Sequence, residues 1–262
     1  MQDKHIKINV PVKDNELLEK ALEWINNDPE IWALWKCINV NAIERLGYSD
    51  HGSVHFQIVA NISLRLMRML KASGIEMSIE KYHKLTYKHA ELVVLLSSLF
   101  HDLGMSIHRD GHEEFSLFIA NNLLRDGLSF LPKKEQVVVT SETLHAIISH
   151  RSNGKPYTLE AGIVRVADAL DMSEGRSRIP YEAGELNIHS VSASAITNVE
   201  IVDGKQKPIQ VNILMNNSAG LFQVDDLLST KLSGSGLEKY VSVRAHIEGD
   251  TEKKLVREVV YE

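Results

Sequence analysis

The pair His101-Asp102 follows a long apolar run and is the first place where this sequence could do chemistry. Burying a carboxylate beside an imidazole costs several kcal/mol unless a partner compensates for the lost hydration. A divalent cation would compensate, because both groups then act as ligands. For an isolated pair, the alternative is a hydrogen bond that closes a helix end near Gly104. The other ligands that the chain supplies decide between the two interpretations.

Further candidate ligands lie before and after this pair. His51 and His55 are four residues apart on a predicted helix, so they share one face. We prefer His55 because it borders the apolar stripe. Asp168 lies in a strongly apolar predicted helix, where its carboxylate would need a cation, a buried base or a helix cap. Asp171, nearer the end of that helix, is the weaker candidate.

Other histidines lie at predicted helix ends. His112 begins one helix, and His150 ends another with His145 five residues before it. Taken singly, each is explained by a solvated histidine at a helix terminus. The remaining histidines are expected at the surface or in the core: His83, His89, His108, His189 and His246.

Helical periodicity dominates the first two thirds of the chain. Residues 1–13 alternate loosely and predict a short strand or an ordered arm. Gly, Pro and Asn clusters separate the segments that follow. The predicted helices cover residues 15–46 with a break at 26–29, then 54–71, 89–103, 111–127, 133–149 and 158–172.

The pattern changes to a period of two after about residue 182, as is typical of strands. Predicted strands cover 186–191, 196–202, 209–215 and 240–247, with a hairpin turn at Asp203-Gly204. Residues 224–232 favour a helix, and 254–261 favour a strand or a short helix. The fold class is therefore mainly α, with a helical domain over 1–182 and a small α+β module over 183–262. This module carries no catalytic signature.

Composition excludes several classes of protein. The 262 residues are 44% hydrophobic and 24% charged, which is ordinary for a globular protein. The net charge of −6 favours no general nucleic-acid surface. No signal-like segment and no apolar run of about 18 residues is present, so we expect a cytoplasmic protein that does not enter a membrane. The lone Cys37 excludes an intrachain disulfide, and we expect it to be buried.

The motifs His55, His101-Asp102 and Asp168 occur in the order H…HD…D, which resembles the HD-domain metal-dependent phosphohydrolases. Their contexts match too: His-x-x-x-Val-Ala, His-Asp-Leu-Gly after an apolar run, and Arg-Val-Ala-Asp-Ala-Leu-Asp. The resemblance covers roughly residues 45–182 and implies an HD-domain helical bundle.

The sequence is also similar to the dinuclear branch of that family, which includes the HD-GYP phosphodiesterases. His112 in Gly-His-Glu-Glu-Phe and His150 in Ser-His-Arg-Ser-Asn-Gly-Lys-Pro match motifs of that branch. One histidine stands where the branch often has two, and the Gly-Tyr-Pro signature reads Gly154-Lys-Pro156. The resemblance therefore implies a second metal but not specificity for cyclic dinucleotides.

The resemblance implies one or two divalent ions, with Mn, Fe, Ni, Co, Zn and Mg all compatible with imidazole and carboxylate ligands. Asp102 would bridge the two ions, and His101 and Asp102 would be catalytic through the water that the metal activates. The substrate would be a small phosphomonoester or phosphodiester, expected to be a nucleotide. The implied ligands are His55 (or His51), His101, Asp102 and Asp168 for the first ion, and His112 and His150 for the second.

Basic residues near the motifs could neutralise substrate phosphate. We select Lys155 and Arg176, whereas solvated surface positions explain Arg109, Arg151 and Arg178. Two other functions stay open: a catalytically silent nucleotide or metal sensor with the C-terminal module as output, and a non-hydrolytic oxygenase on the same scaffold. A homodimer is the expectation from the prevalence of twofold oligomers.

Overall fold

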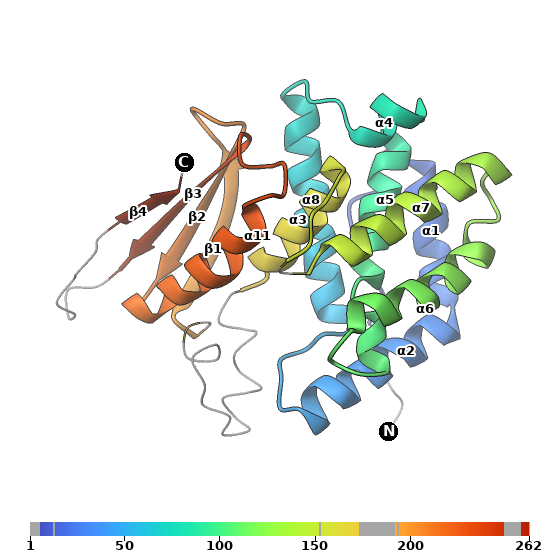
Figure 1. Ribbon diagram of the computed structural model, residues 1–262, viewed down its shortest axis with the longest axis horizontal. Coiled ribbons are helices and arrows are strands. Elements are labelled where there is room, and N and C mark those ends of the chain that lie inside the picture. The colour runs from blue at the N-terminus through green and yellow to red at the C-terminus, as the bar shows by residue number, and fades with distance from the viewer. Residues whose placement is uncertain are drawn as a thin grey trace.

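The computed structural model describes residues 6–12, 14–151, 153–172, 192, 194–248 and 258–261. A bundle of helices forms one side of the molecule and a twisted sheet the other (Figure 1). The helical part comprises α1 (Glu16–Asn27), α2 (Pro29–Asn39), the π-helix η1 (Val40–Arg45), α3 (Ser53–Ala72), α4 (Ser78–His83), α5 (Tyr87–Phe100), the 3₁₀ helix η2 (Leu103–Ser106), α6 (His112–Gly127), α7 (Lys133–Ser149) and α8 (Leu159–Leu170).

Local capping chemistry sets the boundaries of the first helices. The Asn15 side chain accepts hydrogen bonds from the first turn of α1. Asp28 does the same for α2, and Pro29 occupies its first turn, where no amide hydrogen is needed. The predicted break at 26–29 is thereby confirmed. The preceding residues 6–12 form an ordered arm, because Ile8 exchanges two hydrogen bonds with the Asn26 side chain.

Helix α5 is the centre of the bundle. It is buried from Ala90 to Phe100 and packs against α1, α3, α7 and α8. A helix that is apolar on all sides is stable only when neighbours cover every face, which explains its central place (Figure 1). The last turn of α5 leads directly into His101.

The C-terminal module is a sheet with strand order β1-β2-β3-β4, comprising β1 (Ile196–Asp203), β2 (Ile209–Met215), β3 (Val241–Ile247) and β4 (Glu258–Tyr261). The antiparallel hairpin predicted at Asp203-Gly204 joins β1 to β2. Strands β2 and β3 are parallel and therefore need a crossover. That crossover contains η3 (Ser218–Gly220), the π-helix η4 (Gln223–Ser229) and α11 (Thr230–Leu232), and its last two elements pack against α8.

Some predictions differ from the structure or fall outside it. The predicted strand at 186–191 and the predicted boundary between 182 and 183 lie outside the described residues. The expectation that Cys37 is buried is wrong, because its side chain is exposed. The buried positions of α2 are Ile31, Trp35 and Ile38, and helical geometry places Cys37 away from the face that they form.

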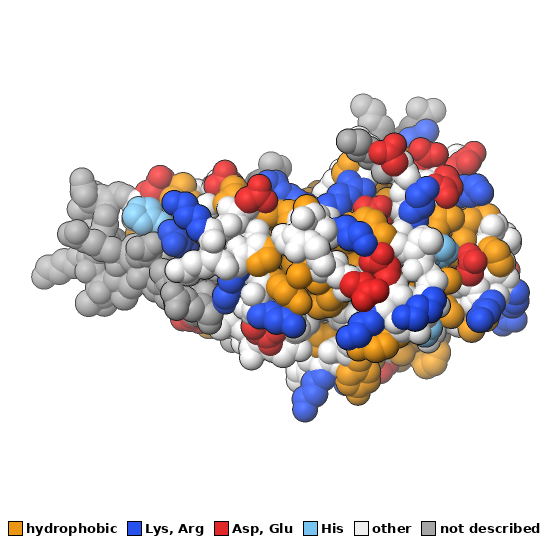
Figure 2. Space-filling view, turned by 90° about the horizontal axis from the view of Figure 1, so that it is seen from above, with side chains coloured by type: hydrophobic (Ala, Val, Ile, Leu, Met, Phe, Trp, Pro, Cys, Tyr) orange, Lys and Arg blue, Asp and Glu red, His pale blue; other side chains and the backbone are white. Residues whose placement is uncertain are grey.

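Surface charge is mixed on the face shown in Figure 2, where Lys and Arg side chains alternate with Asp and Glu over the described residues. Among the helices of the described ranges, none combines the length and apolar composition needed to traverse a bilayer.

Candidate metal centre

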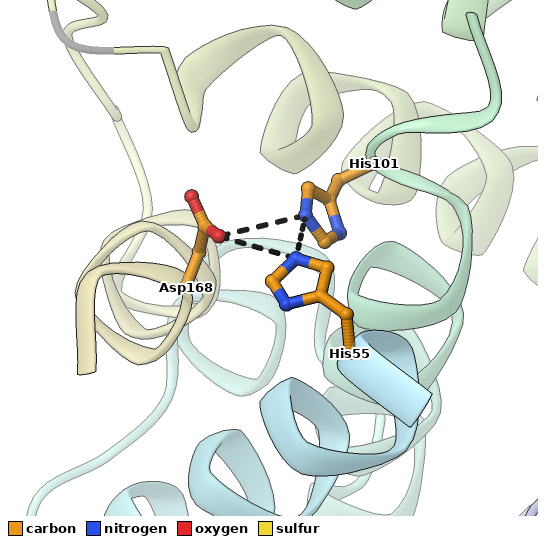
Figure 3. Close-up of side chains that lie close together, drawn as sticks. All are labelled: His55, His101 and Asp168. Atoms are coloured by element: carbon orange, nitrogen blue, oxygen red, sulfur yellow. Dashed lines mark hydrogen bonds and ion pairs between the residues drawn. The ribbon is translucent and has the colours of Figure 1, made fainter. Parts of the chain in front are cut away.

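Three elements bring the H…HD…D residues together. His55 lies on α3, His101 follows the last residue of α5, and Asp168 lies near the end of α8 (Figure 3). The Nε2 atoms of the two imidazoles are 3.2 Å apart. Asp168 Oδ1 lies 3.4 Å from His55 Nε2 and 3.7 Å from His101 Nε2. We call these three residues the first cluster.

A second group of donors lies beside the first. Asp102 Oδ1 is 3.1 Å from Nε2 of His112, the first residue of α6, and 3.5 Å from Nε2 of His150, which follows α7. We call Asp102, His112 and His150 the second cluster. The other oxygen of Asp102, Oδ2, lies 3.6 Å from His101 Nε2 and 4.0 Å from His55 Nε2. Asp102 thus directs one carboxylate oxygen towards each cluster.

The imidazoles are oriented by hydrogen bonds on the side away from the cluster. A carbonyl or carboxylate acceptor at Nδ1 selects the Nδ1–H tautomer and leaves the Nε2 lone pair for a ligand. Such acceptors are Asp171 Oδ2 for His55 (2.6 Å), the Ser98 carbonyl for His101 (3.0 Å) and the Ile147 carbonyl for His150 (2.6 Å).

The hydrogen bonds around His112 do not favour a single tautomer of its imidazole. Its Nδ1 lies 2.9 Å from both the carbonyl oxygen and the guanidinium Nη1 of Arg109. The carbonyl can only accept and the guanidinium can only donate, so the two contacts favour opposite tautomers. His112 therefore lacks the unopposed Nδ1 acceptor that orients each of the other three imidazoles.

The turn after Asp102 brings α6 to the centre. A Cβ at Gly104 would lie 2.0 Å from the His112 carbonyl oxygen, so only glycine permits this approach. The Gly104 amide donates to Ser116 Oγ (2.8 Å), which in turn lies 2.7 Å from the His101 carbonyl oxygen. Gly104 thus allows contact between the His-Asp turn and α6, and α6 places His112 beside Asp102.

The surroundings of both cluster carboxylates favour the ionised form, although Asp102 is buried and Asp168 is mostly buried. Burial raises the pKa of Asp102, but His101, His112 and His150 outweigh this and hold that pKa well below its usual range. Burial likewise raises the pKa of Asp168, but Lys231, His101 and His55 hold it well below its usual range.

The pKa values of the two imidazoles of the second cluster are shifted in opposite directions. Burial lowers the pKa of His150 and so favours the neutral imidazole. Burial also lowers the pKa of His112, but Asp102 and Glu113 outweigh it and the net shift is upward. His150 is therefore ready to act as a ligand near neutral pH, whereas a proton competes for His112.

The remaining predicted site residues lie apart from these clusters or outside the described chain. His51 is half-buried, its Nδ1 lies 2.8 Å from the Ser49 carbonyl, and its ring centroid is 5.7 Å from that of His55. Within the described ranges it belongs to no group of converging donors. Lys155 is exposed in the loop after His150, and Arg176 lies outside the described residues.

Residues that sequence reasoning underrated or missed also contact the clusters. Asp171, the weaker candidate, hydrogen-bonds His55. Glu113 Oε2 lies 3.2 Å from His112 Nδ1 and converges with His112 and His150. Lys231, from the C-terminal module, forms an ion pair with Asp168. Glu113 adjoins His112 in the chain, whereas nothing in the local sequence marks Lys231.

The donor set fits a divalent cation. Imidazole nitrogens and carboxylate oxygens are ligands that Zn²⁺, Mn²⁺, Fe²⁺, Co²⁺ and Ni²⁺ accept. The ionised carboxylates of Asp102 and Asp168 also concentrate negative charge in a mostly buried space, which a cation would neutralise. The first cluster with Asp102 Oδ2 could hold one ion, and the second cluster, through Asp102 Oδ1 and the Nε2 atoms of His112 and His150, could hold another.

Comparison with known proteins identifies the class to which this fold and site belong. The HD domain family model matches residues 53–173. The chain belongs to the HD-domain family, whose members are generally metal-dependent phosphohydrolases.

The chain is also similar to the uncharacterized protein MJ1020 of Methanocaldococcus jannaschii, with 41% identity over 225 residues and coverage of 86% of each chain. Because α8 ends at Leu170, this similarity must extend into the C-terminal module. No solved structure matches the chain.

Proposed function

We propose that this protein is a metal-dependent phosphohydrolase that cleaves a phosphomonoester or phosphodiester bond of a small molecule, a nucleotide being the favoured class. The observation that carries the proposal is the placement of Asp102, whose two carboxylate oxygens face separate groups of imidazoles. One carboxylate between two groups of ligands suits a pair of cations that clamp the attacking and leaving oxygens of a phosphate ester. Membership of the HD-domain family supports the same reaction class.

The chain's own residues would perform three tasks in this reaction. His55, His101, His150 and the two cluster carboxylates hold the cations, and their hydrogen-bond partners keep the Nε2 atoms directed inward. A bound cation supplies an activated water and polarises the phosphoryl group. Burial of the ligands limits competing bulk water. Lys155 and Arg176 remain our sequence-based candidates for substrate phosphate, and the cytoplasm and a homodimer remain the proposed setting and assembly.

The proposal is tested with Mn²⁺-loaded protein and a panel of p-nitrophenyl phosphate, bis(p-nitrophenyl) phosphate and common nucleotides. The variant His101→Ala removes a donor of the first cluster, and His246→Ala, an exposed position on β3, is the matched control. We expect turnover by the parent and the control, and a loss of more than about a hundredfold in His101→Ala, because losing a ligand exceeds the effect of losing a residue that only orients one.

Other outcomes would favour the rival functions. Metal-loaded parent protein that binds a nucleotide but hydrolyses no member of the panel would support the sensor. Oxygen consumption by an iron-loaded form, without phosphate release, would support the oxygenase.

A further inference from the structure

A lysine of the C-terminal module reaches the metal centre. Lys231 lies on α11, and its ammonium forms an ion pair with Asp168 Oδ2. The Lys231 side chain is 12% exposed and that of Asp168 is 15% exposed, so the pair is largely removed from solvent. Burying a lysine is costly without a specific partner, and here the partner is a carboxylate of the first cluster.

The packing of α11 on α8 fixes the position of Lys231. Arg165 of α8 is 2% exposed and donates to the carbonyl oxygens of Thr230, at 3.0 Å, and Gly154. One turn earlier, a Cβ at Gly162 would lie 2.1 Å from the Ser235 carbonyl oxygen. The backbone on both sides of Lys231 is therefore in close contact with the helix that carries Asp168, as the adjacent ribbons of α8 and α11 also show (Figure 1).

The ion pair leaves the metal-facing side of Asp168 available. Asp168 Oδ1 faces His55 and His101, whereas Oδ2 faces Lys231. Lysine would therefore not displace a cation from Oδ1. An ammonium carries three N–H donors, so contact with one carboxylate oxygen leaves it capable of donating to a second anion.

We propose that Lys231 contacts the phosphate group of the substrate, so that the C-terminal module completes the active site. This inference rests on the proposed function, because it takes a phosphate ester as the substrate. Lysine binds phosphate as a compact point charge on a flexible stem. The proposal gives the C-terminal module a contact with the active site that its sequence does not indicate. Lys231 thereby joins Lys155 and Arg176 as a candidate basic residue for binding the substrate phosphate.

The test is titration calorimetry of inorganic phosphate into Mn²⁺-loaded protein. The variants are Lys231→Gln and Lys231→Met, which keeps the aliphatic stem, and the matched control is Lys239→Gln, an exposed lysine of the same module. We expect the phosphate dissociation constant to rise about tenfold or more in both Lys231 variants, the effect of losing one hydrogen bond to a charged group. Lys239→Gln should bind phosphate as the parent does.

Metal content and thermal unfolding are measured on the same samples. We expect the Lys231 variants to keep their metal and to unfold cooperatively. Retained metal with unchanged phosphate affinity would overturn the proposal and leave Lys231 as a link between α11 and α8. Loss of metal would also overturn it, because Lys231 would then serve to orient Asp168. If Lys231→Gln does not fold, Lys231→Met decides by the same criteria.

The outcomes separate this inference from the proposed function. Hydrolysis of the phosphate ester panel with an unchanged KM in Lys231→Gln would sink the inference and leave the phosphohydrolase assignment intact. Phosphate binding that depends on Lys231, in a parent that hydrolyses no phosphate ester, would support Lys231 as a phosphate contact but reject the phosphohydrolase assignment and, with it, the catalytic role of that contact. A metal-loaded parent that binds no phosphate would reject the role of Lys231.

Discussion

The two clusters share Asp102 but are held in different ways. In the first cluster, His55 is backed by the carboxylate of Asp171 at 2.6 Å, and Asp168 supplies an ionised oxygen of its own. In the second cluster, the Ile147 carbonyl orients His150, and the Glu113 carboxylate reaches His112 Nδ1 at a longer 3.2 Å, beside both an acceptor and a cationic donor of Arg109. A carboxylate behind a ligating histidine raises its basicity, whereas a nearby guanidinium disfavours a cation.

This difference predicts an order of metal affinity. The first cluster should retain its ion more tightly, and the second should lose its ion first on dialysis. Because each cluster has two imidazoles, the carboxylates that contact them would then decide the difference in metal affinity. The following variants test that comparison.

The largest effect is expected for His55→Ala, which removes an imidazole donor from the tighter cluster. The affinity of the first cluster for its ion should fall by more than about a hundredfold, because losing a ligand costs more than losing a residue that only orients one. The paired variant His51→Ala should leave that affinity near the parent value, because His51 belongs to no group of converging donors among the described residues. Competition with a chromogenic chelator measures both. A larger loss in His51→Ala would instead identify His51 as the ligand.

A second variant, His150→Ala, should remove the weaker ion and leave the tighter one. His150 faces Asp102 Oδ1, the oxygen directed to the second cluster. Metal analysis after gel filtration should therefore show about half the parent content, as expected for a two-metal site that loses one ion. Equal loss of both ions would mean that the clusters do not bind independently.

A smaller effect is expected for Asp171→Asn, which keeps the size of the side chain but removes its charge behind His55. The first-cluster affinity should fall by roughly tenfold to a hundredfold, the range for partners that orient a ligand. The second-cluster affinity should not change. Asp126→Asn, at an exposed position near the end of α6, is the matched control. An unchanged first-cluster affinity would show that Asp171 does not influence the metal.

The smallest effect is the dependence of the second cluster on pH. The pKa of His112 is raised above its ordinary value in the metal-free protein, so below that pKa a proton must leave before a cation binds. As the pH falls through this pKa, the affinity of the weaker ion should decrease by up to about tenfold per pH unit for one competing proton. Chelator competition measures this pH dependence of metal affinity between pH 6 and 8, about the range around an ordinary histidine pKa. A flat profile would contradict the assignment of His112.

The sequence predicts the helical part well because its signals are local. The apolar run before His101 requires a buried helix, and α5 is that helix. Motif order also indicates His55, Asp102 and Asp168, which the structure brings together. His112 and His150 were ordinary helix-end histidines singly, and only the packing of α6 and α7 on the His-Asp turn shows their convergence.

The contacts between the two parts of the chain were beyond sequence reasoning. Lys231 and Asp168 are 63 residues apart, and their contact depends on the parallel crossover between β2 and β3 and on close packing at Gly162. Neither the periodicity nor the composition of the sequence predicts that the C-terminal module packs against α8 in this way. Asp171 is the weaker candidate in the sequence for a related reason: its place near a helix end predicts exposure, whereas His55 approaches it from α3.

The central claim is that Asp102 joins two metal ions, and elemental analysis of protein purified without chelator tests it most directly. The parent should carry about two equivalents of divalent metal, as a two-metal site requires. Asp102→Ala should lose most of it, and Asp126→Ala should not. The account would be contradicted if the parent protein were purified metal-free and if no added divalent cation bound to it or stabilised it. The cations to add are Mn²⁺, Fe²⁺, Ni²⁺, Co²⁺, Zn²⁺ and Mg²⁺.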